Sequence, residues 1–243
     1  MEAFCINIAG VTAQVQPLFM STRDYCGRYL SDDAPEFFVE VLPEDLIYEQ
    51  NMADIEADAE GLKRRRFTDP FLERSAIQRK IAMELIRRDV ILLHGSTVAV
   101  DGQAYLFTAP CGTGKSTHTR LWRETFGQRA VMVNDDKTFI KVTDTGIFAF
   151  GSPWSGKHGL DSNICCPLRG ICFLQRGPQN RIRPAVADAR LGELLHQTML
   201  PENADLAAMA EQLVTRLSKA VSLWEMECTR EQAAALVAYE AMQ

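Results

Sequence analysis

Residues 109–117, with the sequence APCGTGKST, combine glycine, lysine and hydroxyl side chains in an order suited to phosphate binding. Gly112 and Gly114 allow the backbone N–H groups to curl around phosphate oxygens, and a helix N-terminus adds its positive dipole end. Lys115 would reach the β- and γ-phosphates, and the Ser116 hydroxyl is placed to bind a bridging magnesium ion. We therefore expect ATP or ADP, with Mg²⁺, to contact Cys111, Gly112, Thr113, Gly114, Lys115, Ser116 and Thr117.

The full phosphate-loop pattern G-x-x-x-x-G-K-[ST] has glycine at the position that Ala109 occupies here. The alternative is a polar turn that only starts a helix, since Ser and Thr cap helices and Gly relaxes turns. An apolar strand pattern before the segment and a helical pattern after it favour the phosphate loop.

A second element of phosphate chemistry follows at Asn134-Asp135-Asp136, directly after the apolar run AVMV. Adjacent acids at the end of a strand point in different directions. One can therefore approach the metal while the other accepts a proton from the acceptor hydroxyl. Adjacency leaves open which of Asp135 and Asp136 ligates magnesium and which acts as the base, and an ordinary acidic turn is the alternative.

The elements that must position these residues alternate between helical and strand patterns. Residues 90–100 and 104–109 predict antiparallel strands around Asp101-Gly102, and a helix over 115–126 should end at Gly127. Further elements are expected as a helix over 70–88, a strand over 130–136, a hairpin over 138–151, strands over 170–176 and 222–228, and helices over 188–199 and 204–219. The capping-box pattern Thr229-x-x-Gln232 predicts a last helix. The sequence thus predicts an α/β fold with a mixed sheet.

The N-terminal part, residues 1–68, carries none of this chemistry. Residues 1–43 predict a small sheet, and the polar stretch 43–67, which ends in the basic run 63–66, predicts a boundary or a mobile lobe. We therefore expect a small N-terminal α+β region over 1–68 and a phosphate-loop core with C-terminal helices over 69–243. The N-terminal region either chooses the acceptor or merely covers one face of the core sheet.

Composition narrows the classes of partner. The 243 residues include 26 Lys and Arg against 32 Asp and Glu, a net charge of −6, which disfavours nucleic acid. The apolar runs are shorter than a membrane span, and the first residues lack a secretory signal pattern. Seven cysteines without a C-x-x-C spacing indicate free thiols, so we expect a cytoplasmic protein.

With these motifs in order, residues 90–175 resemble the HPr kinase/phosphorylase and phosphoenolpyruvate carboxykinase superfamily, and within it the small bacterial HPr-kinase-like proteins. The resemblance rests on His94-Gly95, Asp101-Gly102, the loop 111–116 and Asp135-Asp136. The segments GSPWSGKHG and PLRG, with Lys157 and Arg169, are similar to conserved segments of that subfamily.

The resemblance implies a role for each of these residues. Asp135 and Asp136 would share the acid–base and metal roles, and His94 would lie near the transferred phosphoryl group. Lys157 or Arg169 would neutralise charge in the transition state. The alternatives are that His94 is only a hydrogen-bonded histidine at a strand end, and that Lys157 and Arg169 are surface charges.

The chain also departs from the family pattern. Thr117 follows the loop serine where the bifunctional HPr enzymes have Glu, which weakens the case for phosphorylase activity or for HPr as the acceptor. The chain lacks the further lysine, histidine and arginine set with which carboxykinases hold manganese and oxaloacetate.

We expect an ATP- and magnesium-dependent kinase that phosphorylates a hydroxyl group. The acceptor would be serine in a peptide or small protein, or a small molecule such as free serine. The alternative is a nucleotide-binding regulatory or scaffold module without catalysis. The sequence leaves open whether the protein forms a homo-oligomer.

Overall fold

Two units make up the chain, Met1–Glu84 and Leu85–Gln243, in a computed structural model that describes residues 1–59 and 61–243. Each unit is described by itself. The division after Glu84 assigns most of one long helix, α3 (Asp69–Ile86), to the N-terminal unit. The sequence predicts this boundary earlier, after Thr68. No helix in the described part of the chain is both long and apolar enough to cross a membrane.

Unit 1 contains the small sheet that the sequence predicts. Strands β1 (Phe4–Ile8) and β2 (Val11–Gln16) form an antiparallel hairpin, and β3 (Phe37–Glu40) pairs with β2 in parallel. The hairpin turn at Ala9-Gly10 has φ angles of 55° and 79°, which suit a tight turn between twisted strands. The short helices α1 (Ser21–Tyr25) and η1 (Gly27–Tyr29) connect β2 to β3.

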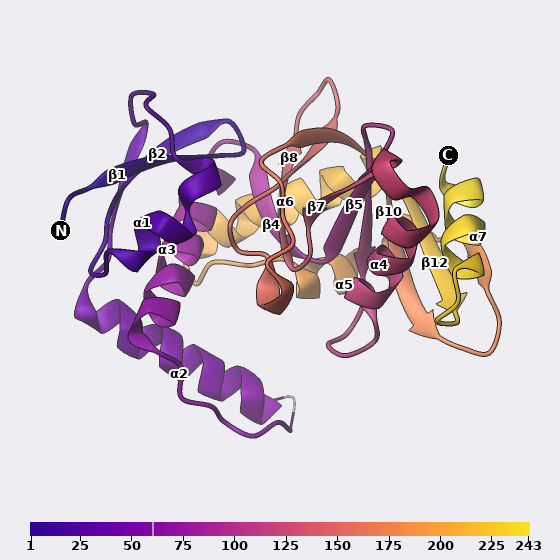
Figure 1. Ribbon diagram of the computed structural model, residues 1–243, viewed down its shortest axis with the longest axis horizontal. Helices are drawn as coiled ribbons and strands as arrows, with labels where there is room; N and C mark the ends of the chain where they lie inside the picture. The colour runs from indigo at the N-terminus through magenta and orange to yellow at the C-terminus, as the bar shows by residue number, and fades with distance from the viewer. Residues whose placement is uncertain (60) are drawn as a thin grey trace. The chain divides into compact units, whose positions relative to one another are not determined.

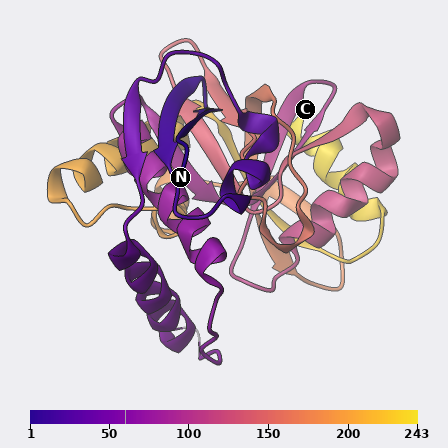
Figure 2. The ribbon, with the colours of Figure 1, turned by 60° about the vertical axis from the view of Figure 1, so that its left-hand side comes forward.

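Helix α2 (Pro43–Ala59) corrects the expectation of a boundary or mobile lobe over 43–67. Ion pairs join it to α3, with Arg79 Nε 2.6 Å from Glu49 Oε1 and Lys80 Nζ 2.6 Å from Asp45 Oδ2. None of its residues is buried, so the helix lacks the apolar stripe by which helices are usually predicted. Figures 1 and 2 both show α2 as a rod that extends away from the β1–β3 sheet.

Unit 2 is built on a nine-stranded mixed sheet, which confirms the expected α/β class. Strand β10 (Cys165–Arg176) joins its two parts. The other strands are β4 Val90–His94, β5 Ser96–Val100, β6 Gln103–Thr108, β7 Ala130–Asn134, β8 Lys137–Val142, β9 Ile147–Phe150, β11 Arg181–Pro184 and β12 Ser222–Cys228. In one part of the sheet, β4, β8 and β9 are antiparallel, and β9 pairs with the start of β10. In the other part, β6 and β12 flank β10 in parallel, while β5 pairs antiparallel with β6 and β7.

The helices of unit 2 cover both faces of this sheet (Figure 1). Trp122 of α4 (Lys115–Phe126) packs against Phe107, and Arg190 of α5 (Ala187–Gln197) lies over Phe173. Phe107 is the register partner of Cys172, so Phe173 faces the opposite side, and α4 and α5 therefore lie on opposite faces. Helix α7 (Ala233–Met242) packs with α4, and α6 (Ala204–Ala220) packs with α5.

Two sequence expectations differ in detail from the structure. The expected strand 90–100 is divided at Gly95, so that β4 pairs with β8 while β5 pairs with β6. A Cβ at Gly95 would lie 2.9 Å from Leu106 Cδ2 and 3.1 Å from the Phe107 carbonyl oxygen, so only glycine fits the crossing. The last helix is present, but Gln232 makes no side-chain cap and the Thr229 hydroxyl accepts instead from the Glu231 N–H. The capping-box expectation is therefore wrong.

Candidate functional site

The glycine-rich loop connects β6 to α4 at the carboxyl end of β6. Gly112 and Gly114 have φ angles of 74° and 121°, in the region that favours glycine, which lets the chain reverse before the helix. Lys115 Nζ donates to the Ala109 carbonyl oxygen at 2.9 Å and closes the loop on itself. Gly114 supplies no side-chain cap, so the first N–H groups of α4 have no side-chain acceptor there. The loop thus combines an uncapped helix N-terminus with a lysine.

Ala109 stands where the phosphate-loop pattern has glycine, and the structure shows why alanine is accommodated. Among the described residues, positive φ outside glycine occurs only at Ala9, Asp89 and Asp101, so Ala109 does not need glycine's conformational freedom. Its side chain is buried in the core beside Trp122 and Phe107. Alanine here contributes packing without preventing the turn.

Asn134 fixes the acidic pair at the end of β7. Its Oδ1 accepts from the N–H groups of Asp136 at 2.8 Å and Lys137 at 2.7 Å, and its Nδ2 donates to the Ser152 carbonyl and hydroxyl oxygens at 3.0 Å. Asn134 is fully buried, so these bonds cannot be exchanged for water without opening the turn. Sequence reasoning missed Asn134, although a short polar side chain before a turn is a signal for this function.

Asp135 turns inward toward the first turn of α4. Its side chain is 6% exposed, and Oδ1 accepts from the Ser96 hydroxyl at 2.6 Å. The Ser96 hydroxyl is in turn 2.7 Å from that of Thr119, which contacts the backbone carbonyls of Lys115 and Ser116. A chain of buried hydroxyl groups therefore connects Asp135 to the loop helix.

Asp136 points the other way and pairs with His94. His94 Nε2 is 3.3 Å from Asp136 Oδ1, and the two side chains are 30% and 35% exposed. Burial raises the pKa of Asp136, but the hydrogen bond from His94 and the positive charges nearby outweigh it. The pKa consequently lies below its usual value, so Asp136 is a carboxylate at neutral pH.

Two lysines contribute to the charge around Asp136. Lys115 and Lys137 both lower its pKa, and Lys137 is the register partner of His94 on the adjacent strand. Burial lowers the pKa of Lys115 itself, against the opposing influence of Cys111 and the two carboxylates. The structure therefore brings Lys137, which sequence reasoning did not single out, to the same cluster as Lys115, Asp136 and His94.

Lys157 lies in the 3-10 turn η3 (Gly156–His158), and its side chain is exposed. The turn reaches the acidic pair through Gly156, where a Cβ would lie 3.0 Å from that of Asp136. Asp161 joins the same segment to β7, because it bridges to Asn134 and its Oδ2 accepts from the Ser155 hydroxyl at 2.8 Å. Lys157 thus directly follows the residue that approaches Asp136, and its own side chain is exposed to solvent.

Arg169 is not brought to the loop. It lies on β10 four residues before Phe173, the register partner of Thr108 at the end of β6, and so about 13 Å back along the strand. Its charge instead influences Tyr105, near the start of β6, where burial raises the tyrosine pKa and Arg169 opposes the increase.

Arg176, at the far end of the same strand, contacts the loop in place of Arg169. Its Nε donates to the Thr113 carbonyl oxygen at 2.9 Å, and Nη2 donates to that of Gly112. Because β6 and β10 are parallel and in register, their carboxyl ends meet at one edge. Sequence reasoning missed Arg176 because its position depends on this pairing, which only the fold reveals.

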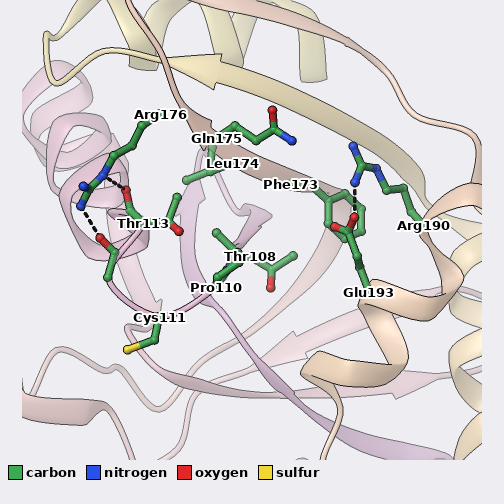
Figure 3. Close-up of a pocket in the computed structure, with 12 residues that line it drawn as sticks. Thr108, Pro110, Cys111, Thr113, Phe173, Leu174, Gln175, Arg176, Arg190 and Glu193 are labelled. Atoms are coloured by element: carbon green, nitrogen blue, oxygen red, sulfur yellow. Dashed lines mark hydrogen bonds and ion pairs between the residues drawn. The ribbon is translucent and has the colours of Figure 1, made fainter. Parts of the chain in front are cut away.

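A pocket of about 450 Å³ opens beside the loop. Figure 3 shows Arg176 at one end and the ion pair of Arg190 with Glu193 at the other. Phe173 forms part of its wall, with the Arg190 guanidinium 5.2 Å from the ring centre. The lining residues are Thr108, Ala109, Pro110, Cys111, Gly112, Thr113, Phe173, Leu174, Gln175, Arg176, Arg190 and Glu193.

Comparison with known proteins gives little further support for a family or a function. No protein-family model and no curated protein matches the chain. Among solved structures, the chain is similar to the HPr(Ser) kinase/phosphatase from Coxiella burnetii, with 14% identity, 51% of this chain and 87% of that chain covered, and a TM-score of 0.30. That score is too low to carry an argument about fold or activity.

Proposed function

We propose that this chain is a phosphotransferase that uses ATP and magnesium to phosphorylate a hydroxyl group, with residues 109–117 as its phosphate loop. The observation that carries the proposal is the convergence of the loop lysine, Lys115, with a buried and a one-third-exposed carboxylate, Asp135 and Asp136. A nucleotide-binding turn alone needs no second carboxylate, whereas phosphoryl transfer needs a metal ligand and a group that receives a proton.

The loop and its pocket suit a nucleotide. The uncapped N–H groups at the start of α4 and the ammonium group of Lys115 provide the donors that phosphate oxygens require. The pocket of about 450 Å³ falls within the usual range for small-molecule sites. In this proposal, the phosphates lie on the loop and the nucleoside occupies the pocket.

Ser116 and Asp135 fit a magnesium ion. Magnesium prefers oxygen ligands and is usually held by one or two protein groups together with substrate phosphates and water. Bound magnesium would neutralise negative charge that develops on the phosphates.

Asp136 is suited to receive the proton of the acceptor hydroxyl. It is ionised at neutral pH and accessible, and the phosphates of a bound nucleotide would raise its pKa toward a more effective range for a base. His94 holds the carboxylate in orientation. In this proposal Lys115 and Lys137 supply positive charge close to the transferred group in place of Arg169, which lies about 13 Å back along β10.

The test of the proposal is calorimetric titration with magnesium ADP. Lys115→Ala should abolish measurable binding, whereas Lys219→Ala, which removes an exposed lysine from the last turn of α6, should leave the affinity unchanged. Equal heats from the wild type and Lys115→Ala would overturn the phosphate-loop assignment.

A transfer assay with labelled ATP then separates a kinase from a nucleotide-binding module without catalysis. The acceptors to compare are free serine, short serine-containing peptides and HPr. Transfer to any of them supports the kinase. Tight nucleotide binding without transfer or ATP hydrolysis supports the module.

A further inference from the structure

The outer side of the glycine-rich loop carries a contact that the proposed chemistry does not use. Arg176 bonds two successive loop carbonyls from a single guanidinium group, with its Nε 2.9 Å from the Thr113 oxygen and Nη2 on that of Gly112. Both carbonyls belong to the stretch that precedes the helix, between the two residues of positive φ.

This contact has a physical consequence for the loop. N–H groups can converge on an anion only if the neighbouring carbonyls turn outward, where they need donors. Two glycines also give the loop a large conformational entropy, which must be lost each time the loop takes the binding conformation. A planar guanidinium that bridges both carbonyls satisfies them together and holds the loop in one conformation.

We propose that Arg176 is a positioning residue that holds the loop in its anion-binding conformation before the ligand arrives. The effect of Arg176 on ligand affinity rests on the proposed nucleotide function, whereas its restraint on the loop can be measured without any ligand. Arg176 acts through the backbone of Gly112 and Thr113, and its contribution depends on fork geometry rather than on positive charge alone.

The first test is hydrogen–deuterium exchange of the ligand-free protein. Arg176→Lys keeps the charge but cannot bridge two carbonyls as a fork, and Arg176→Gln removes the charge. Both should speed amide exchange in residues 109–117, while the same two changes at Arg181, an exposed arginine on β11, should not. Unchanged exchange in both Arg176 variants would overturn the proposal, whether or not the protein binds nucleotide.

The second test compares magnesium ADP with magnesium pyrophosphate, which lacks the nucleoside. We expect both Arg176 variants to lose affinity for both ligands by the same factor, about tenfold to hundredfold, because hydrogen bonds to a charged group contribute on that scale. Near wild-type affinity in Arg176→Lys would show that charge alone matters and would overturn the positioning role. A loss confined to ADP would also overturn it, since Arg176 would then contact the nucleoside.

The two tests distinguish failure of this inference from failure of the proposed function. If wild-type protein binds neither ligand, the nucleotide proposal fails, and the exchange data alone decide whether Arg176 restrains the loop. If wild-type protein binds both and the Arg176 variants match it, the nucleotide proposal stands and the inference fails.

Discussion

In unit 1 the carboxylate of Glu73 is fully buried and accepts from the N–H groups of Leu18 and Phe19 and from the Thr22 hydroxyl. In unit 2 the carboxylate of Asp136 is one-third exposed and has His94, itself ionisable, as its partner. Glu73 lies on α3, and Asp136 lies in the turn between β7 and β8. One is surrounded by fixed donors, and the other keeps a side open to solvent.

This difference distinguishes Glu73, a carboxylate that stabilises the fold, from Asp136, a carboxylate that can take part in a reaction. The three bonds that Glu73 accepts hold the segment before α1 and the start of α1, so its role is to connect α3 to that segment. A proton donor can reach Asp136, because the carboxylate is one-third exposed and its neighbours are ionisable side chains rather than backbone N–H groups. The sequence alone does not distinguish them, since both are acids beside apolar segments.

The largest expected effect is on the turnover number, when the solvent-exposed carboxylate of Asp136 is removed. Asp136→Asn keeps the size of the side chain but cannot accept the acceptor proton, so the turnover number should fall about 10²- to 10⁴-fold while the dissociation constant for magnesium ADP stays within about twofold. Steady-state transfer and calorimetry measure the two quantities. Asp144→Asn, on the exposed β8–β9 turn, is the matched control. Turnover at the wild-type rate in Asp136→Asn would remove the base from the proposal.

Removing the buried carboxylate of Glu73 should lower the stability of the fold instead. Glu73→Ala leaves three buried donors without their acceptor and should lower the free energy of unfolding by about 3 kcal/mol. Glu73→Gln retains one acceptor oxygen and should cost less. Urea denaturation measures both against Glu211→Ala, an exposed change on α6 expected within about 0.5 kcal/mol of wild type. A Glu73→Ala protein as stable as the control would contradict the structural role.

Local patterns were sufficient to predict the loop and its flanking elements. The helix over 115–126 matches its predicted bounds, because Gly127 marks its end and the segment GTGKS marks its start. Helix α2 escaped prediction because ion pairs from Arg79 and Lys80, rather than an apolar stripe, hold it in place. The information that defines α2 is therefore distributed over residues about 30 positions apart in sequence.

Side-chain partners depended on topology that the local pattern does not contain. Arg169 and Arg176 lie on one strand, and the sequence favoured Arg169 through a family resemblance. The parallel register of β10 with β6 brings Arg176 to the loop and leaves Arg169 at the other end. Ser96 and Thr119 likewise meet Asp135 only because β5, α4 and the end of β7 come together.

Unit 2 also contains an enclosed ionisable group, which extends the comparison into the loop helix itself. His118 is three residues after Lys115 and is buried, and its Nε2 accepts from Trp122 Nε1 at 3.1 Å while its ring packs 4.5 Å from that of Phe107. Its Nδ1 has no hydrogen-bond partner among the described residues. Burial lowers the pKa of His118 from 6.5 to about 4, so the folded protein holds it neutral.

This lowered pKa predicts the smallest of the three effects, a loss of stability in acid. Between pH 6.5 and 4 the unfolded chain binds a proton that the folded chain excludes, so stability is complete above this range and falls as the pH decreases. The expected loss between pH 7 and pH 5 is about 2 kcal/mol. In urea denaturation at both values, His118→Gln should be less stable at pH 7 but show a smaller decrease toward pH 5, while His196→Gln, an exposed change on α5, should retain the wild-type decrease. An unchanged pH dependence in His118→Gln would mean that other groups account for the acid sensitivity, and that enclosure of His118 contributes packing rather than a proton-linked term.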